Sequence, residues 1–438
     1  MAILGGVCLV PAASLPAAAQ TTDWTGAASS NWFDASNWTN GVPVAGGTAT
    51  IDATAPNAPV VNAPGAAADV VGVGLGSVGA LTMTGGGTLS SVDGYVGQTL
   101  GSHGTVTVTG TGSNWSVSQV LYVGNSGTGM LTIEGGGTVS SLYGYVGAVP
   151  GSEGTVTVTG AGSTWTNSQN LFVGNAGTST LTIADGATVS SVNGYVGYVN
   201  IGRGTITVTG AGSTWTSSGN LFVGDDGTGT LAIANGGTVS NTDGYLGRSA
   251  FSSGAVTVTG NGSTWINSGS LFVGHDGTGT LAIANGGTVS NTDGYLGRSA
   301  FSSGTVTVTG AGSTWTNSGN LFVGNAGTGM LTIAAGGRVS GAIGSVGNDT
   351  GSSGTVTVTG TGSDWTNSGN LFVGNAGIGA LTIADGGRVS NAIGFVGFGA
   401  GSQGSMTVTG AGSAWSNSSS SRSAAAARAY SPSRMAEP

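Results

Sequence analysis

The sequence has no lysine, a single cysteine and very few charged residues. Of its 438 residues 6% are charged, and the formal net charge of −9 comes from 17 acidic residues against eight arginines. Nucleic-acid binding needs a stripe of basic residues that displaces counterions, and a GxxxxGK[ST] phosphate loop needs a lysine. The composition therefore excludes a nucleic-acid partner and this class of nucleotide site.

Residues that ligate metals or act as nucleophiles are also scarce. Cys8 is the one cysteine, and the two histidines, His103 and His275, occupy different positions of the repeat described below. A tetrahedral zinc site needs several Cys, His or carboxylate ligands. We expect no metal, no cofactor and no enzyme activity.

Carboxylates are the remaining candidates for catalysis, because some β-solenoids cleave polysaccharides. The loop residues Asp225, Asp226 and Asp276 share a corner that other repeats fill with Asn175 or Asn325. Asp and Asn exchange in this way where the chain makes a turn. A carbohydrate-active solenoid enzyme therefore stays as the least favoured alternative.

The first twenty residues, 1–20, form an apolar stretch that closes on Ala17, Ala18 and Ala19. Small residues after an apolar stretch are typical of a secretory signal peptide, although no basic residue precedes this one. Cleavage would also remove Cys8, which suits passage through an oxidising compartment. We predict export, with a buried N-terminal strand as the alternative.

Glycine is abundant, and the chain repeats itself. The 89 glycines show no three-residue period, and the segment TVTVTG that begins at Thr105 returns with small variations every fifty residues, as far as Ser405. A fixed period of this length indicates a repeat architecture. It excludes collagen and favours a packed structure rich in turns.

Each fifty-residue unit divides into two related halves of about 25 residues, and fourteen halves span residues 71–420. In the segment 105–109, valine alternates with threonine, so the valines share one face of a strand. A half-unit has the length of one solenoid coil, and fourteen coils stacked about 4.8 Å apart would make a rod of about 65–70 Å. We predict an all-β fold, a β-solenoid (parallel β-helix) of about fourteen coils in seven 50-residue repeats.

One tryptophan recurs in every repeat and is the candidate site series. The aligned residues of the companion half-units are Leu89 and then valines such as Val139, which favours a buried structural ladder over an exposed ladder that contacts glycans. The series consists of Trp115, Trp165, Trp215, Trp265, Trp315, Trp365 and Trp415.

Residues 21–70 do not match the repeat and contain Trp24, Trp32 and Trp38. We interpret this segment as an N-terminal cap, because the first coil would otherwise present an open strand edge. A separate carbohydrate-binding module with aromatic platforms is the alternative.

Regular repetition ends near residue 420, and 421–438 form an aberrant tail. The fifty-residue period predicts LTIADG at 431–436, where the chain has SPSRMA. Codons for LTIADG, read one base later, encode SPSRMA, so we interpret the tail as a frameshifted continuation of the repeat. A genuine Ser/Ala-rich tail is the alternative, and the nucleotide sequence in the other frame decides between them.

The repeat LFVGNAGTGTLTIADGG…GTVTVTGAGSTWTNSGN, preceded by NWFDASNWTNGVP, resembles passenger regions of bacterial type V autotransporters over residues 24–420. The resemblance implies export, display outside the cell as a β-solenoid, and a C-terminal β-barrel in the outer membrane. This chain has no segment with the ten-residue alternation of such a barrel. We therefore expect either a truncated product or a separately encoded partner, an outer-membrane β-barrel translocator.

Many such passengers are adhesins, so the resemblance implies adhesion to a host glycan, to matrix or to a cell-surface receptor. The alternative is a structural stalk that displays functional sequence missing from this chain. The threonine rows also resemble the flat hydroxyl faces of ice-binding solenoids, but Ala232 and Ala282 interrupt them. A soluble β-surface is the simpler interpretation of these rows.

Overall fold

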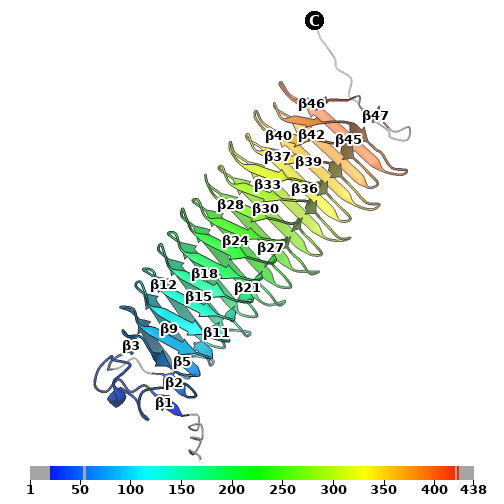
Figure 1. Cartoon of the computed structure of the whole chain (residues 1–438). Coiled ribbons are helices and arrows are strands. Elements are labelled where there is room, and N and C mark those ends of the chain that lie inside the picture. Colours follow the sequence, from blue (N-terminus) through cyan, green and yellow to red (C-terminus); the bar gives the residue numbers. More distant parts are fainter. Residues whose placement is uncertain (1–19, 53–55, 420–421, 424–438) are drawn as a thin grey trace, which may run out of the picture.

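The computed structural model describes residues 20–52, 56–419 and 422–423, which form an elongated β-solenoid of about 16 turns (Figure 1). Three parallel sheets run the length of the rod and contain 17, 15 and 15 strands. We call them sheets 1, 2 and 3, in the order in which each coil passes through them. The one helical element in the described part is the short 3-10 helix η1 (Ala35–Asn37).

Two coils make one fifty-residue repeat, as the sequence predicted. A representative repeat comprises β17 (Leu171–Val173), β18 (Thr178–Ala184) and β19 (Thr188–Ser191), followed by β20 (Gly194–Val196), β21 (Arg203–Thr209) and β22 (Thr214–Ser217). Successive coils pair in parallel, with Leu181 beside Ile206 in sheet 2 and Val189 beside Trp215 in sheet 3.

The fourteen predicted coils are confirmed and run from β5 (Val70–Val73) to β46 (Ala414–Asn417). One further coil precedes them and consists of β2 (Thr48–Ile51), β3 (Val60–Val61) and β4 (Ala66–Ala67). Part of the segment 21–70 is thus itself a solenoid coil. At the other end, β47 (Arg422–Ser423) pairs with β44 (Gly394–Val396).

The two coils of a repeat have different lengths. In sheet 1, Leu171 pairs with Gly144 on one side and Gly194 on the other, which corresponds to spacings of 27 and 23 residues. The longer coils carry six residues between the strands of sheets 1 and 2, as between Val196 and Arg203, where the shorter coils carry four. The longer loops therefore stand out at every second coil along one edge of the rod.

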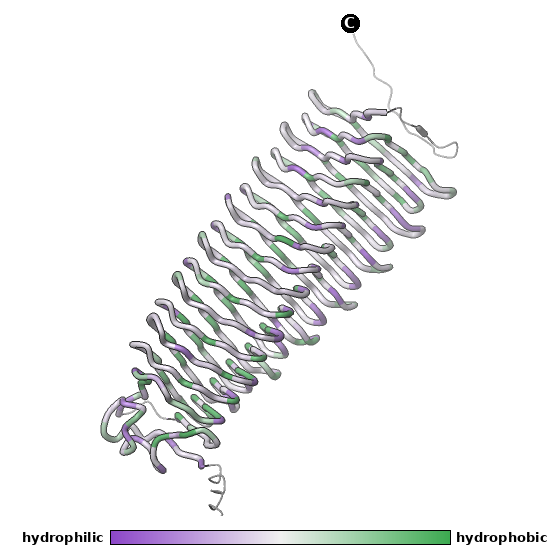
Figure 2. Tube along the Cα trace, viewed as in Figure 1, coloured by the Kyte–Doolittle hydropathy of each residue, from purple (hydrophilic) through white to green (hydrophobic). Residues whose placement is uncertain are grey.

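The core follows directly from the alternation of apolar and polar residues. In β18 and β21, leucine, isoleucine and valine point inward and are fully buried, whereas the threonines between them face solvent. Stacking the coils turns each inward position into a continuous apolar column, which is how a coil that cannot bury its own face becomes stable. Figure 2 shows apolar and polar residues recurring at corresponding places in successive coils.

The segment before the first coil lies against the end of the solenoid. Its strand β1 (Thr21–Asp23) pairs in parallel with β2 and so covers the edge that β2 would otherwise expose. Trp24 and Trp32 each meet Trp38 edge to face, with ring centroids 4.9 and 4.7 Å apart. All three rings are buried, so the alternative of a module with exposed aromatic platforms is wrong for this segment.

Two predictions fall on residues that the structure does not describe. The signal peptide (1–20) lies outside the described residues except for Gln20, and the frameshifted tail (421–438) lies outside them except for Arg422 and Ser423. In the part of the chain that is described, no helix has the length and apolar character needed to span a membrane.

Candidate functional site

The repeated tryptophans lie inside the solenoid. Six of the seven indoles, from Trp115 to Trp365, are 0–1% exposed, and Trp415 in the last complete coil is partly buried. A ring that stacks on a sugar must offer a face to solvent, so the glycan-contact alternative is wrong for these six residues. They form a structural column.

Glycine in the same coil makes room for each indole. A Cβ added to Gly194 would lie 2.4 Å from Cζ2 of Trp215, whereas the shorter coils have leucine at the position of Gly194, as in Leu171. Layers that contain glycine and tryptophan thus alternate with layers that contain leucine and valine. The alternation keeps the cross-section filled at constant volume, which close-packed interiors require.

A polar ladder runs beside the buried indoles. Asn241 accepts a hydrogen bond from Nε1 of Trp265 at 2.8 Å and donates to Oδ1 of Asn267 at 2.7 Å. Asn291 repeats both contacts with Trp315 and Asn317. These interactions satisfy polar atoms that would otherwise be costly to bury.

Aromatic side chains on the outer face of sheet 1 form a second column. Their centroids are 4.6–5.3 Å apart and their planes lie within 7–21° of each other. Each ring covers the face of its neighbour, so the column offers ring edges and hydroxyls rather than free faces. The stacked rings are Tyr95, Tyr122, Tyr145, Phe172, Tyr195, Phe222, Tyr245, Phe272, Tyr295 and Phe322, then Phe372 and Phe395 after an interruption at Ser345.

Two fully exposed phenylalanines with positive φ define the candidate site. Phe251 and Phe301 are the third residues of equivalent turns in the longer loops, and each is 104% exposed. Both have a φ of 70°, a left-handed conformation that is a genuine outlier for a bulky residue.

The fold itself does not ask for phenylalanine at this position. In the turn 249–252, the Ser252 amide donates to the Ser249 carbonyl at 3.1 Å, and the third residue, Phe251, has positive φ. Four other repeats have glycine there, with φ of 80–84°, at Gly101, Gly151, Gly351 and Gly401, and a fifth has Ile201, whose φ is not positive. Strain held where glycine would relieve it is a mark of functional positions.

The two rings flank a shallow groove on the edge of the rod. The groove has a volume of about 620 Å³ and is lined by both phenylalanines, by Asp276 and Thr278 of the intervening coil, and by small residues between them. The rings are two strand spacings, about 9.6 Å, apart along the rod. The Asp276 carboxylate between them is 46% exposed, and Nδ1 of His275 lies 3.4 Å from it.

The two repeats that carry the phenylalanines differ in one charged contact. The Arg248 guanidinium binds the Asp225 carboxylate at 2.8 Å and lies 4.9 Å from the centre of the Phe222 ring. The residue equivalent to Asp225 in the next repeat is His275, and Arg298 has no carboxylate partner among the described residues.

Burial raises the pKa of the Asp225 carboxyl, and the hydrogen bond and charge of Arg248 oppose this rise without cancelling it. The exposed neighbour Asp226 adds to the rise.

The described residues contain no cluster of three or more His, Cys, Asp or Glu side chains that could hold a metal ion. The groove therefore combines two apolar rings with one accessible carboxylate, which is the chemistry of a binding surface.

Reasoning from the sequence missed the phenylalanine pair, although a signal for it exists. Aligning the repeats places Phe251 and Phe301 opposite glycine in four other repeats and opposite Ile201 in a fifth. An aromatic residue where most repeats have a turn glycine is unusual. The loop acid Asp276 is a candidate catalytic group in the sequence, and the structure places it in the groove with the two rings. Of the two histidines, the structure places His275 beside it, with Nδ1 3.4 Å from the carboxylate.

Similarity to known proteins is slight. No family model matches the sequence, and no curated protein matches it. A similar solved structure is the crystal structure of a TibC-catalysed hyper-glycosylated fragment of TibA, residues 55–350, which is 16% identical. The match covers 85% of this chain and 97% of that chain, with a TM-score of 0.41. At these values the similarity assigns neither a family nor a function.

Proposed function

We propose that this chain is the exported, surface-displayed passenger of a bacterial autotransporter and acts in adhesion through its Phe251–Phe301 groove. The observation that carries adhesion is the full exposure of two phenyl rings in turns where glycine would be less strained. Exposed aromatic residues are typical anchors of protein interfaces.

The partner that best fits the groove is a protein surface, such as matrix or a cell-surface receptor. Phenyl rings offer no hydrogen-bonding atom, and the groove has few polar groups besides Asp276 and Thr278. A sugar would need several such groups to orient its hydroxyls. An apolar side chain with a nearby basic group would meet both rings and the carboxylate.

Saturable binding of the full chain to immobilised matrix proteins and to host cells tests the proposal. The variant F251A/F301A removes both rings and is expected to lower binding about tenfold or more, because aromatic anchors dominate interface energies. The matched control L100S removes an apolar side chain that is 87% exposed in the equivalent loop of another repeat and should leave binding unchanged.

The outcomes separate the alternatives. Unchanged binding by F251A/F301A contradicts adhesion through this groove. No saturable binding by the unchanged chain to any protein or cell favours a stalk. Binding to a panel of glycans, lost in the same variant, replaces the protein partner with a carbohydrate.

Export and display form the second part of the proposal, with an outer-membrane β-barrel translocator as the partner. The parallel solenoid and the repeat pattern of residues 24–420 support it. Antibody labelling of intact cells that express the chain with a translocator should detect the solenoid outside. Labelling that appears only after the cells are opened contradicts display. We assign no enzymatic reaction to the chain.

A further inference from the structure

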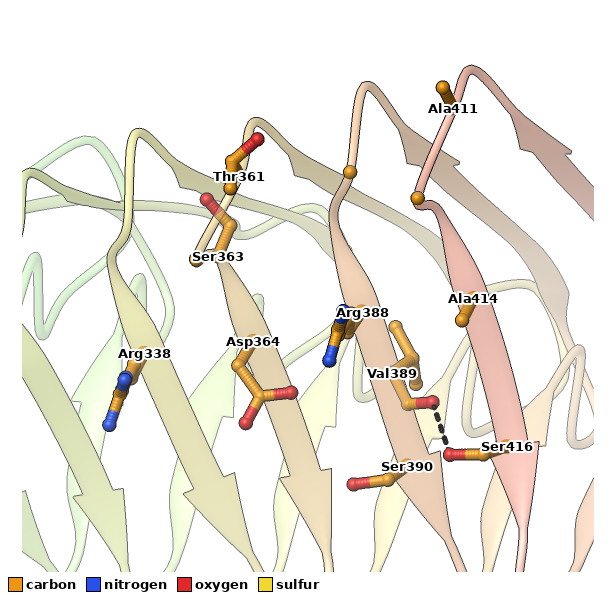
Figure 3. Close-up of a pocket in the computed structure, with 13 residues that line it drawn as sticks. Arg338, Thr361, Ser363, Asp364, Arg388, Val389, Ser390, Ala411, Ala414 and Ser416 are labelled. Carbon is orange, nitrogen blue, oxygen red and sulfur yellow. Dashed lines mark hydrogen bonds between the residues drawn. The ribbon is translucent and has the colours of Figure 1, made fainter.

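A groove lies on the outer face of sheet 3 in its last strands (Figure 3). It has a volume of about 590 Å³. Strands form its floor, and the turns that contain Thr361, Gly386 and Ala411 stand along one side. The floor strands are β37 (Arg338–Gly341), β40 (Asp364–Asn367), β43 (Arg388–Asn391) and β46 (Ala414–Asn417).

In this groove the first residue of three successive sheet 3 strands is charged. Arg338, Asp364 and Arg388 follow one another as direct cross-strand neighbours in the ladder. In the ten preceding coils the same position is threonine, or asparagine once, and these residues suit an exposed strand without any charge. They are Thr88, Asn114, Thr138, Thr164, Thr188, Thr214, Thr238, Thr264, Thr288 and Thr314. The fold therefore does not require the charged residues.

Opposite charges on neighbouring strands attract each other, but no direct ion pair joins these three side chains in the sheet. Among the described residues, the ion pairs are those of Arg248 with Asp225 and of His275 with Asp276, and neither arginine of the groove takes part in one. The Asp364 carboxylate accepts a hydrogen bond from Oγ1 of Thr366 at 3.0 Å. Both guanidinium groups are exposed and have their donors directed to the groove side of the sheet.

The order of charges along the rod suits one kind of ligand. Arginine binds carboxylates through two parallel hydrogen bonds, and the two arginines are two strand spacings, about 9.6 Å, apart. Asp364 between them repels an anion but accepts a hydrogen bond from a hydroxyl. The column thus alternates between sites for an anion, a hydroxyl and an anion.

We propose that this groove binds an acidic polysaccharide that carries a carboxylate on every second sugar and lies along the solenoid axis. The carboxylates bind Arg338 and Arg388, and the sugar between them donates a hydroxyl hydrogen to Asp364. Ser390 and Ser416 on the floor supply further hydroxyls. The site is separate from the Phe251–Phe301 groove and goes beyond the proposed function.

Calorimetric titration of the full chain tests the site with hyaluronan oligosaccharides, in which glucuronic acid alternates with N-acetylglucosamine. N-Acetylglucosamine oligomers of equal length serve as the neutral probe. The variant R338T/R388T restores the residue of the preceding coils and should lower hyaluronan affinity about tenfold or more, because charge-assisted hydrogen bonds are the strong ones. The neutral oligomer should bind weakly or not at all.

The control R203S/R298N removes the same two charges elsewhere and places the residues found at Ser253 and Asn348 in equivalent coils. It should bind hyaluronan as the unchanged chain does. Equal loss in both double variants, or equal binding of both probes, overturns the proposal, because either result indicates a general charge effect or no anion site.

The variant D364T tests the middle position. It is expected to weaken binding, because it removes the acceptor of the sugar hydroxyl, and tighter binding overturns the alternating arrangement. The F251A/F301A variant should keep full hyaluronan affinity. A failure of this site is therefore distinguishable from a failure of adhesion through the phenylalanine groove.

Discussion

Phe251 and Phe301 hold a conformation that favours glycine, and this strain gives a stability prediction at the scale of single residues. The left-handed region costs about 1–2 kcal/mol for a residue with a Cβ, and the exposed rings lose no burial when removed. We expect F251G/F301G to raise the free energy of unfolding by about 0.5–1 kcal/mol per site, measured by denaturant titration.

The matched variant F251A/F301A removes the same rings but keeps the Cβ and the strain. It should gain little stability, although it should lose binding as fully as F251G/F301G does. If the glycine and alanine variants have the same stability, the turns are not strained. A gain in stability with a loss of binding would show a surface shaped for contact at the expense of the fold.

Asp225 gives a second prediction at this scale, with a defined pH dependence. Burial raises the pKa of its carboxyl in the folded chain, so its favourable contribution is full at low pH and is lost as the pH rises through the folded pKa. Asparagine occupies the equivalent position in other repeats, and Asn175 there donates to the Ala148 carbonyl at 2.7 Å.

We therefore expect D225N to be more stable than the unchanged chain at pH 7, by about 0.5–1 kcal/mol, a usual size for single substitutions. The two should converge below the ordinary Asp pKa of 3.8. Unfolding measured from pH 3 to 8 checks this, with D276N at an exposed position of the next repeat as the control. A variant that is less stable at pH 7 would mean that the Arg248 ion pair outweighs burial.

At the scale of strands and their side-chain ladders, the polar ladder beside the indoles lacks one asparagine. Gly341 stands where Asn241, Asn291 and Asn391 occupy equivalent positions. Across from it, the buried side chain of Asn367 and Nε1 of Trp365 have no hydrogen-bond partner among the described residues. A Cβ added at Gly341 would meet its nearest neighbour, the Gly319 carbonyl oxygen, at an ordinary 3.4 Å.

We expect G341N to raise the free energy of unfolding by about 1–2 kcal/mol, because it would accept from Trp365, donate to Asn367 and remove two unsatisfied groups. The variant G341A supplies the Cβ without the amide and should gain about 0.5–1 kcal/mol at most. Denaturant titration of both variants measures the difference. Equal stability of the two would mean that the ladder contributes nothing.

The elements also show what a sequence can and cannot predict here. Period-two alternation and the fifty-residue repeat predicted the strands and coils, because each inward position recurs in every coil. The same alternation places Asn367 on the inner face with Trp365, so the polar ladder beside the indoles can be predicted from the sequence. The strain at Phe251 could not be predicted, because equivalent turns differ in φ at this position: Ile201 does not have the positive φ of Phe251. The Arg338–Asp364–Arg388 column appears only when cross-strand register brings three distant residues together.

At the scale of the whole molecule, the repeat unit is two coils, and this determines how the rod tolerates deletion. Deleting residues 271–320 removes one longer and one shorter coil and joins Ser270 to Leu321, as existing repeats do. The glycine–tryptophan and leucine–valine layers then still alternate. We expect a cooperative solenoid of nearly unchanged stability, shorter by two strand spacings, about 9.6 Å, as measured by small-angle X-ray scattering.

Deleting residues 271–293 instead removes only a shorter coil. Two tryptophan layers then become neighbours, and Trp315 loses Asn291, which accepts its Nε1 hydrogen bond at 2.7 Å. A misfilled layer and an unsatisfied buried donor together should lower the free energy of unfolding by about 3 kcal/mol or more. Because solenoid stability is nearly a sum of coil and interface terms, the smaller deletion should be the more damaging one. Equal stability of the two shortened chains would mean that single coils are interchangeable and that the alternation of layers has no energetic weight.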